Sequence, residues 1–158
     1  MNMHFLTLSL SILLAFAGIN SGSTGASQNE TSENFQPVKT IVINSNDQMR
    51  FDTSEIRVKA GEKVKLTLNH TGKLPKNAMG HNFVLLEAGT NVAKFSQAAM
   101  NAKATEYIPA KGVLAHTKLV GGGESTTIEF TAPKKGTYDF ICSFPGHYAM
   151  MKGKFIVE

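Results

Sequence analysis

The chain has 158 residues, and a hydrophobic content of 42% is enough for one core, so its length indicates a single domain of ordinary size. Its 16 Lys and Arg residues against 12 Asp and Glu residues give a net charge of +4, and the basic residues are scattered singly along the chain. A nucleic-acid-binding surface needs clustered Lys and Arg, so this class of function is not indicated.

The N-terminal segment differs in composition from the rest. Residues 5–19 are apolar but too short for a confident membrane span, and Ala15-Phe16-Ala17 has the A-x-A pattern of signal-peptidase sites. We predict a signal peptide over residues 1–17, with cleavage as late as about residue 27; an uncleaved anchor or a buried strand is the alternative. Residues 18–36 read as a flexible polar leader, residues 37–158 as the folded domain, and the location as periplasmic. We expect membrane contact only if the N-terminal segment is retained.

Residues 37–158 consist mainly of short segments with alternating apolar and β-branched residues, separated by Gly, Pro, Asn and Asp. Many short strands at this spacing predict an all-β antiparallel sandwich or barrel. The expected strands are 40–43, 56–58, 63–68, 82–86, 126–130, 138–141 and 153–157. Residues 90–107 are the exception, because Val92, Phe95, Ala99 and Ala102 share a helical face, which predicts one short helical insertion.

The stretch C-S-F-P-G-H-Y-A-M-M, residues 142–151, holds the single cysteine of the chain. One cysteine cannot form an internal disulfide, so in an oxidising compartment Cys142 is either buried or held by a ligand. Two His and one Cys with a distant Met form the ligand set of blue copper sites. This stretch supplies Cys142, His147 and Met151, and the stretch L-P-K-N-A-M-G-H-N-F offers His81 as the second histidine.

With both stretches in hand, the chain resembles the azurins, bacterial members of the cupredoxin family of blue copper proteins. The resemblance runs from about residue 39 to the C-terminus. It rests on N-D-Q-M-R-F (46–51), L-P-K-N-A-M-G-H-N (74–82), A-H-T-K-L (115–119) and C-S-F-P-G-H-Y-A-M-M-K-G (142–153). It implies an all-β Greek-key sandwich of about eight strands and one type 1 copper ion used for electron transfer.

The resemblance also implies a role for each matching position. His81, Cys142 and His147 would be the in-plane ligands, Met151 the distant axial ligand, and the backbone oxygen of Gly80 a weak axial ligand opposite it. Asn82 would hydrogen-bond around the Cys142 loop, and the Phe144 amide would donate to the thiolate. Redox partners such as c-type cytochromes or copper and haem reductases would dock on an apolar patch. Its members would be Met49, Leu74, Ala78, Met79, Phe144, Pro145, Ala149 and Met150.

The sequence departs from the azurin pattern at two places. Azurins usually carry a disulfide at the positions of Lys39 and Glu62, whose opposite charges could form a salt bridge instead. His70 matches a family histidine linked to pH-dependent behaviour, but Thr71 follows it where azurins often have proline.

Other functions remain open at the level of sequence. The main alternative is a copper-binding or copper-buffering protein without a dedicated electron-transfer role. A copper enzyme such as a nitrite reductase would need a second copper site with more histidines. A Cys142–His147 nucleophile would need an orienting third group that the sequence does not supply. We therefore predict a protein that is not an enzyme. Zinc is a possible competitor for the site, because His and Cys bind it too.

Overall fold

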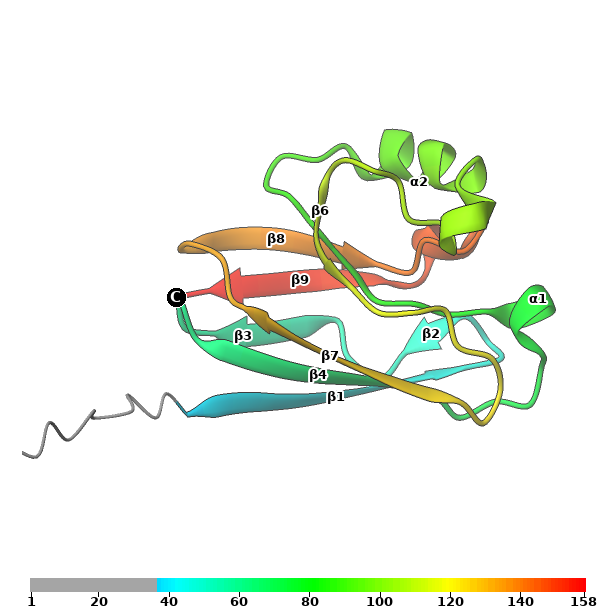
Figure 1. The fold of residues 1–158 in the computed structure, drawn as a ribbon, viewed down its shortest axis with the longest axis horizontal. Helices are drawn as coiled ribbons and strands as arrows, with labels where there is room; N and C mark the ends of the chain where they lie inside the picture. Colours follow the sequence, from blue (N-terminus) through cyan, green and yellow to red (C-terminus); the bar gives the residue numbers. More distant parts are fainter. Residues whose placement is uncertain (1–36) are drawn as a thin grey trace, which may run out of the picture. The chain divides into compact units, whose positions relative to one another are not determined.

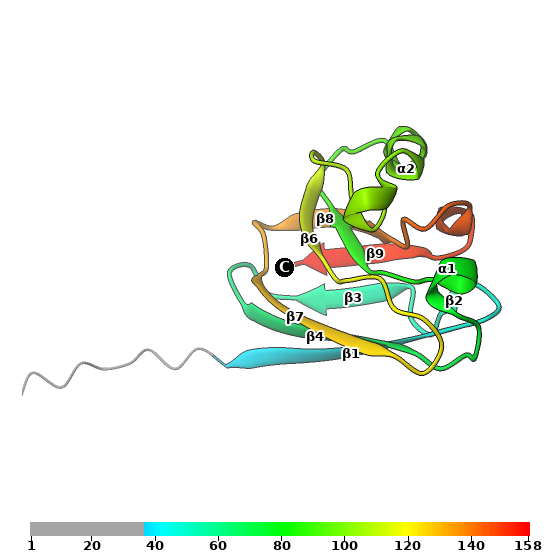
Figure 2. The ribbon, with the colours of Figure 1, turned by 45° about the vertical axis from the view of Figure 1, so that its right-hand side comes forward.

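The computed structural model describes residues 37–158. The predicted signal peptide and leader lie outside the described residues. Nine strands form two sheets that pack face to face (Figures 1 and 2). The four-stranded sheet has the order β2-β1-β4-β7, and the five-stranded sheet has the order β3-β9-β8-β5-β6. The predicted all-β sandwich is thus confirmed, with nine strands where about eight were expected.

The strands of the four-stranded sheet are β1 (Val38–Asn46), β2 (Arg50–Phe51), β4 (Lys63–His70) and β7 (Ser125–Thr131). Those of the five-stranded sheet are β3 (Glu55–Val58), β5 (Val84–Leu86), β6 (Val113–His116), β8 (Gly136–Ile141) and β9 (Lys152–Val157). The helices are α1 (Lys76–Met79) and α2 (Val92–Met100), with the 3₁₀ turns η1 (Lys103–Thr105) and η2 (His147–Ala149). No helix within residues 37–158 is both long and apolar enough to cross a membrane.

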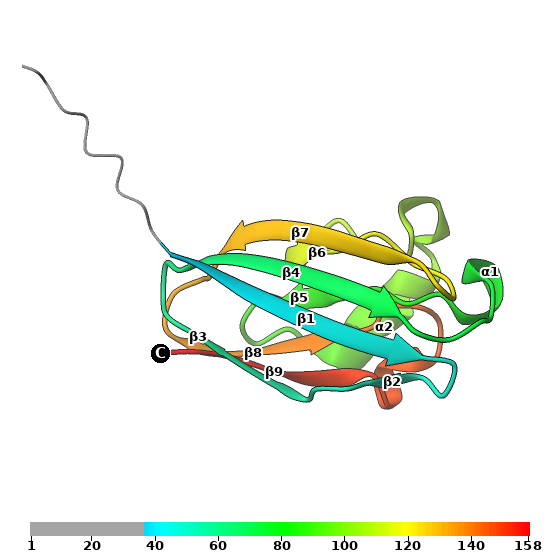
Figure 3. The same cartoon turned by 90° about the horizontal axis from the view of Figure 1, so that it is seen from below.

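Most strand pairs are antiparallel, as predicted, but two are parallel, which the alternation along single strands did not indicate. β1 pairs with β4, and β3 pairs with β9, each in parallel (Figure 3). Parallel neighbours need a crossover connection rather than a hairpin. Here the chain leaves β1, passes through β2 and β3 on the way, and returns as β4 beside β1. This connection carries the β1–β2 turn to the end of the sandwich where α1 and η2 lie (Figure 1).

The core follows from alternation along the strands. In β4, Val64, Leu66 and Leu68 are buried while their neighbours are exposed or half-buried, as the period of two requires. β5 is the exception, since Val84, Leu85 and Leu86 are all buried. Leu85 belongs to the core between the sheets, whereas Val84 and Leu86 form a second cluster with Phe95 of α2. The helix therefore covers the outer face of the five-stranded sheet.

The helical insertion is shorter than residues 90–107. Asn91 caps α2 by accepting a hydrogen bond from the Lys94 amide at 3.0 Å. Phe95 and Ala99 are buried as predicted, but the helix ends at Met100, so Ala102 lies beyond it. Glu106 and Tyr107 then take positive φ angles of 55° and 65°, a local backbone state that apolar periodicity does not reveal.

Two short strands and one ion pair differ from expectation. β2 has only two residues, and β6 has the sequence V-L-A-H, in which apolar and polar residues do not alternate. A Lys39–Glu62 salt bridge is not among the ion pairs of residues 37–158. The Glu62 carboxylate instead accepts a hydrogen bond from the Lys59 amide at 2.9 Å and closes its own turn.

Candidate metal centre

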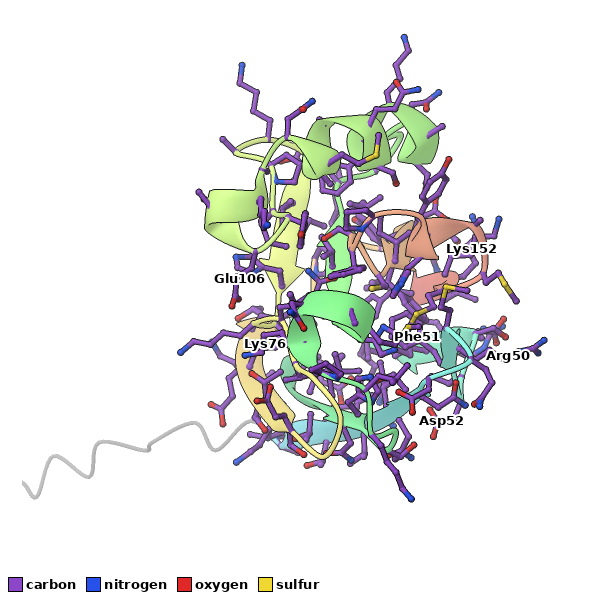
Figure 4. The ribbon with its side chains drawn as sticks, turned by 90° about the vertical axis from the view of Figure 1, so that its right-hand side faces the viewer. Arg50, Phe51, Asp52, Lys76, Glu106 and Lys152 are labelled. Atoms are coloured by element: carbon purple, nitrogen blue, oxygen red, sulfur yellow. The ribbon has the colours of Figure 1, made fainter. Side chains whose placement is uncertain are left out.

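The predicted ligands come from two segments that meet at one end of the sandwich. His81 follows α1, whereas Cys142, His147 and Met151 lie in the connection from β8 through η2 to β9. Figure 4 looks onto this end, with Lys76 of α1, Phe51 of β2 and Lys152 of β9 around it. His81, Cys142 and Met151 are fully buried, and His147 is 4% exposed. The site therefore excludes bulk water.

The three side chains that would hold a metal, those of His81, Cys142 and His147, point their ligand atoms at one another. The Cys142 Sγ lies 3.9 Å from His81 Nδ1 and 3.7 Å from His147 Nδ1, and the two Nδ1 atoms are 3.2 Å apart. The point equidistant from these three atoms lies about 2.1 Å from each, close to the metal–nitrogen and metal–sulfur bond lengths of protein sites. Among residues 37–158, this is the one group of three His, Cys, Asp or Glu side chains with such spacing.

His81 is oriented by contacts that the sequence did not suggest. Its Nε2 lies 2.9 Å from the Asn46 carbonyl oxygen, which can only accept, so Nε2 carries the proton and Nδ1 faces the site unprotonated. Its backbone exchanges two hydrogen bonds with Val120, at 2.9 and 2.8 Å. Asn46 lies at the end of β1, so the crossover topology brings its carbonyl to the histidine.

The loop from Cys142 to Met151 is closed by its own backbone. The Cys142 amide donates to the Met151 carbonyl at 2.9 Å, and the Met151 amide donates to the His147 carbonyl at 2.8 Å. Gly146 has φ 85°, a left-handed conformation that glycine adopts without strain. This turn brings His147 back beside Cys142, as the spacing predicted.

Met151 and Gly80, which would also contribute to holding the metal, are less closely constrained. Met151 packs in a buried cluster with Cys142, Leu119 and Phe144. On the other segment, the Gly80 carbonyl oxygen lies 4.0 Å from the Cys142 Sγ. A Cβ at Gly80 would come within 2.5 Å of the Lys76 carbonyl oxygen, so only glycine lets this backbone approach the site.

Asn82 and Ser143 connect the His81 segment to the cysteine loop. The Asn82 Oδ1 accepts from the Ser143 amide at 2.8 Å, and its Nδ2 donates to the Ser143 hydroxyl at 2.9 Å. Both residues are buried, so these bonds join the His81 segment to the Cys142 loop without competition from water. The backbone amides of Asn82 and Phe144 also favour the thiolate form of Cys142. Sequence gave no signal for the contribution of Ser143.

His70 lies behind the site rather than in it. Its ring stacks on His81 with centroids 4.4 Å apart. Its Nδ1 accepts from the Gly72 amide at 3.0 Å, and its Nε2 donates to the Met79 carbonyl at 2.9 Å. Both ring nitrogens are thus engaged in hydrogen bonds. The stack restricts the orientation of His81 from one side.

Burial sets the protonation of the metal-free ligands. It raises the pKa of the Cys142 thiol to about 12, against the opposing effect of the Asn82 and Phe144 amides. Burial also lowers the pKa of His147 to about 4, and repulsion from His81 and His70 adds to this shift. Burial lowers the pKa of His81 in the same direction. At neutral pH both imidazoles are therefore ready ligands, whereas the thiol must lose a proton when a metal binds.

This protonation predicts how copper binding depends on pH. Between 6.5, the ordinary histidine pKa above which His81 and His147 are both unprotonated, and the pKa of Cys142, about 12, the apparent affinity for Cu(I) should rise about tenfold per pH unit, since binding releases the thiol proton. At lower pH the affinity should fall more steeply once His81 and His147 bind protons too, His147 with a pKa of about 4. Competition with a Cu(I) chelator at several pH values measures this slope. An affinity independent of pH would contradict the protonated thiol.

The residues of the predicted apolar patch differ in exposure. Leu74 and Met150 are 42% and 51% exposed, and Ala78 and Ala149 are also exposed. Met49, Met79 and Pro145 are half-buried. Phe144 is only 9% exposed and packs its ring against His147 at 4.7 Å. Phe144 therefore supports the histidine more than it contributes surface.

The donor set fits copper. One thiolate, two imidazoles and a thioether form a soft set that suits copper, whereas zinc sites rarely use a thioether. With three ligand atoms arranged around one point, this set in an all-β sandwich defines a mononuclear type 1, or blue, copper protein.

Relatives assign the chain to a family. It belongs to the copper-binding proteins of the plastocyanin/azurin family, whose pattern matches residues 38–158. It is 42% identical over 120 residues to the azurin of Bordetella pertussis, covering 72% of this chain and 80% of that protein. It is 43% identical over 117 residues to the outer membrane protein H.8 of Neisseria gonorrhoeae, covering 71% of this chain and 63% of that protein. The chain thus spans less than two thirds of the length of that relative.

Solved structures support the same family. The blue copper protein auracyanin A of Chloroflexus aurantiacus superimposes with a TM-score of 0.71 at 33% identity, over 77% of this chain and 100% of that one. The resemblance to azurin-like cupredoxins and the copper cofactor are thereby confirmed.

Proposed function

We propose that this protein is a soluble periplasmic electron carrier, without enzymatic turnover, whose single copper ion cycles between Cu(II) and Cu(I). The observation that carries the proposal is the buried Cys142–His81–His147 triangle next to a partly apolar surface. Copper bound there would supply one-electron redox chemistry. The periplasmic location rests on the signal peptide predicted for residues 1–17.

The rigid placement of the ligand residues supports an electron-transfer role. His81 is fixed by Asn46 and Val120, and Cys142 by Met151 and Asn82, so the ligand positions are set by the fold. Ligands that are held in place move little when the charge of a bound ion changes, and the closed site keeps water away. Both effects favour rapid electron transfer over substrate binding.

The patch beside His147 supplies the surface for contact with partners. Weak, small and mostly apolar contacts suit transient redox complexes. Exposed Leu74, Ala78, Ala149 and Met150 lie on the segments that carry the ligands. The partners we propose are redox proteins such as c-type cytochromes or copper and haem reductases.

Electron self-exchange between oxidised and reduced copper-loaded protein tests this function. Leu74→Gln should lower the self-exchange rate about tenfold. In the complex of two copies of the protein, each copy would lose part of the free energy gained by burying a leucine at the contact. Leu114→Gln is the matched control, since Leu114 is 43% exposed but lies on β6, outside the patch. Equal rates for both variants would place the contact elsewhere. A copper-loaded protein that exchanges no electrons would favour the copper-buffering function.

A further inference from the structure

Methionines are concentrated at the metal end of the domain. The described residues contain Met49, Met79, Met100, Met150 and Met151, and only Met100, on α2, lies away from the ligand segments. Met151 is the predicted axial ligand. Met49 packs against the cluster of Cys142 and Met151, Met79 ends α1 just before Gly80, and Met150 follows η2. Yellow sulfur atoms gather between Phe51 and Lys152 in Figure 4.

An apolar docking patch does not by itself explain these methionines. Leucine gives the same apolar area, and this patch already uses one at Leu74. Met49 also takes φ 55° in the turn between β1 and β2, where a side chain other than Gly or Asn costs about 1 kcal/mol. A strained methionine that packs on the metal-site cluster indicates a use for its side chain.

The buried site poses a problem of access for copper. His81, Cys142 and Met151 are 0% exposed, so an ion must pass the segments around them, and Met79 and Met150 directly precede Gly80 and Met151 on these segments. Thioether sulfur is a soft ligand that selects Cu(I), and the long unbranched side chain of methionine adapts its position easily. Three thioethers on residues that adjoin the site in sequence or pack against it therefore offer additional ligands suited to Cu(I).

We propose that Met49, Met79 and Met150 form a loading surface that binds Cu(I) transiently and passes it to His81, Cys142 and His147. The transfer is a ligand exchange without redox change: thioether–copper bonds break, bonds to the site ligands form, and the Cys142 proton leaves to solvent. The proposal rests on the copper site and not on the electron-transfer function.

Loading kinetics test the proposal. Metal-free protein is mixed anaerobically with the Cu(I)–bicinchoninate complex, and the loss of the complex's absorbance gives the rate. The triple variant Met49→Leu, Met79→Leu, Met150→Leu should load about tenfold more slowly, a loss typical of changes beside a metal site. The single variant Met150→Leu, at an exposed position that tolerates substitution, should show part of this loss. Met100→Leu, 52% exposed and on α2, should stay within about twofold of the unaltered protein.

Uptake of Cu(II) shows whether slower loading of Cu(I) comes from the loss of thioether ligands or from a change in the shape of the surface. The triple variant should take up aqueous Cu(II) at the unaltered rate, since thioethers favour the soft Cu(I) ion. Unchanged Cu(I) loading in the triple variant, or equal slowing for both ions, would overturn the proposal. Self-exchange of the loaded variant reports on electron transfer separately, because leucine keeps the apolar surface.

Discussion

Replacing Cys142 by Ser is expected to lower the affinity for copper roughly a hundredfold or more. Structural sites with four ligands bind with apparent free energies of 10–16 kcal/mol, so one strong ligand accounts for about 3 kcal/mol. The thiol points at both histidine nitrogens and no other cysteine exists in the chain, so nothing replaces it. Competition with a copper chelator measures the change.

The fold itself should survive this substitution. Cys142 is fully buried, but Ser is close in size, and its backbone bond to Met151 is unaffected. Thermal melts of the metal-free variant should therefore stay within a few degrees of the unaltered protein, as for a change of less than about 1 kcal/mol. A variant that folds and keeps copper affinity within threefold would show that Cys142 is not a ligand.

Replacing Asn82 by Ala should lower the free energy of unfolding by about 3 kcal/mol, because the buried backbone amide and hydroxyl of Ser143 would lose their hydrogen-bond partners. Asn82 accepts from the Ser143 amide and donates to its hydroxyl, and both residues are buried. The thermal midpoint of the metal-free protein should fall by roughly 10 °C. The copper-loaded variant should also change its reduction potential, since the Cys142 loop loses its tie to the His81 segment.

Asn69→Ala is the matched control for Asn82. Asn69 makes two side-chain hydrogen bonds, to Asn44 at 3.0 Å and Ser125 at 2.7 Å, but it is half-buried. Water can replace its partners, so its loss should cost less than about 1 kcal/mol and leave the potential unchanged. If the Asn82 variant melted like the Asn69 variant, the bonds to Ser143 would not be structural.

Local spacing explains why the metal ligands could be predicted from sequence. Cys142, His147 and Met151 lie on one loop, so their proximity depends on a single turn at Gly146. The second histidine came from a motif that resembles the azurins. What the sequence could not show depends on distant contacts: the Asn46 carbonyl reaches His81 across 35 positions, and only the β1–β4 crossover places it there.

The same distinction applies to the fold. Alternation in β4 and β9 predicted strands because one face of each is buried. β2 is too short to alternate, β6 has three apolar residues in a row, and the parallel pairs depend on the order of strands rather than on any one of them. The helix was overextended because Ala102 continues the apolar face of α2 after its backbone has left the helix at Asn101.

The visible absorption spectrum of residues 37–158 after addition of Cu(II) tests the blue copper site most directly. With Cys142 3.7 and 3.9 Å from the two histidine nitrogens, we expect an intense blue band from thiolate-to-copper charge transfer, bleached by a reductant. A protein that binds Cu(II) and stays colourless would show that the thiolate is not bound in this geometry. That result would also contradict the proposed electron-transfer function.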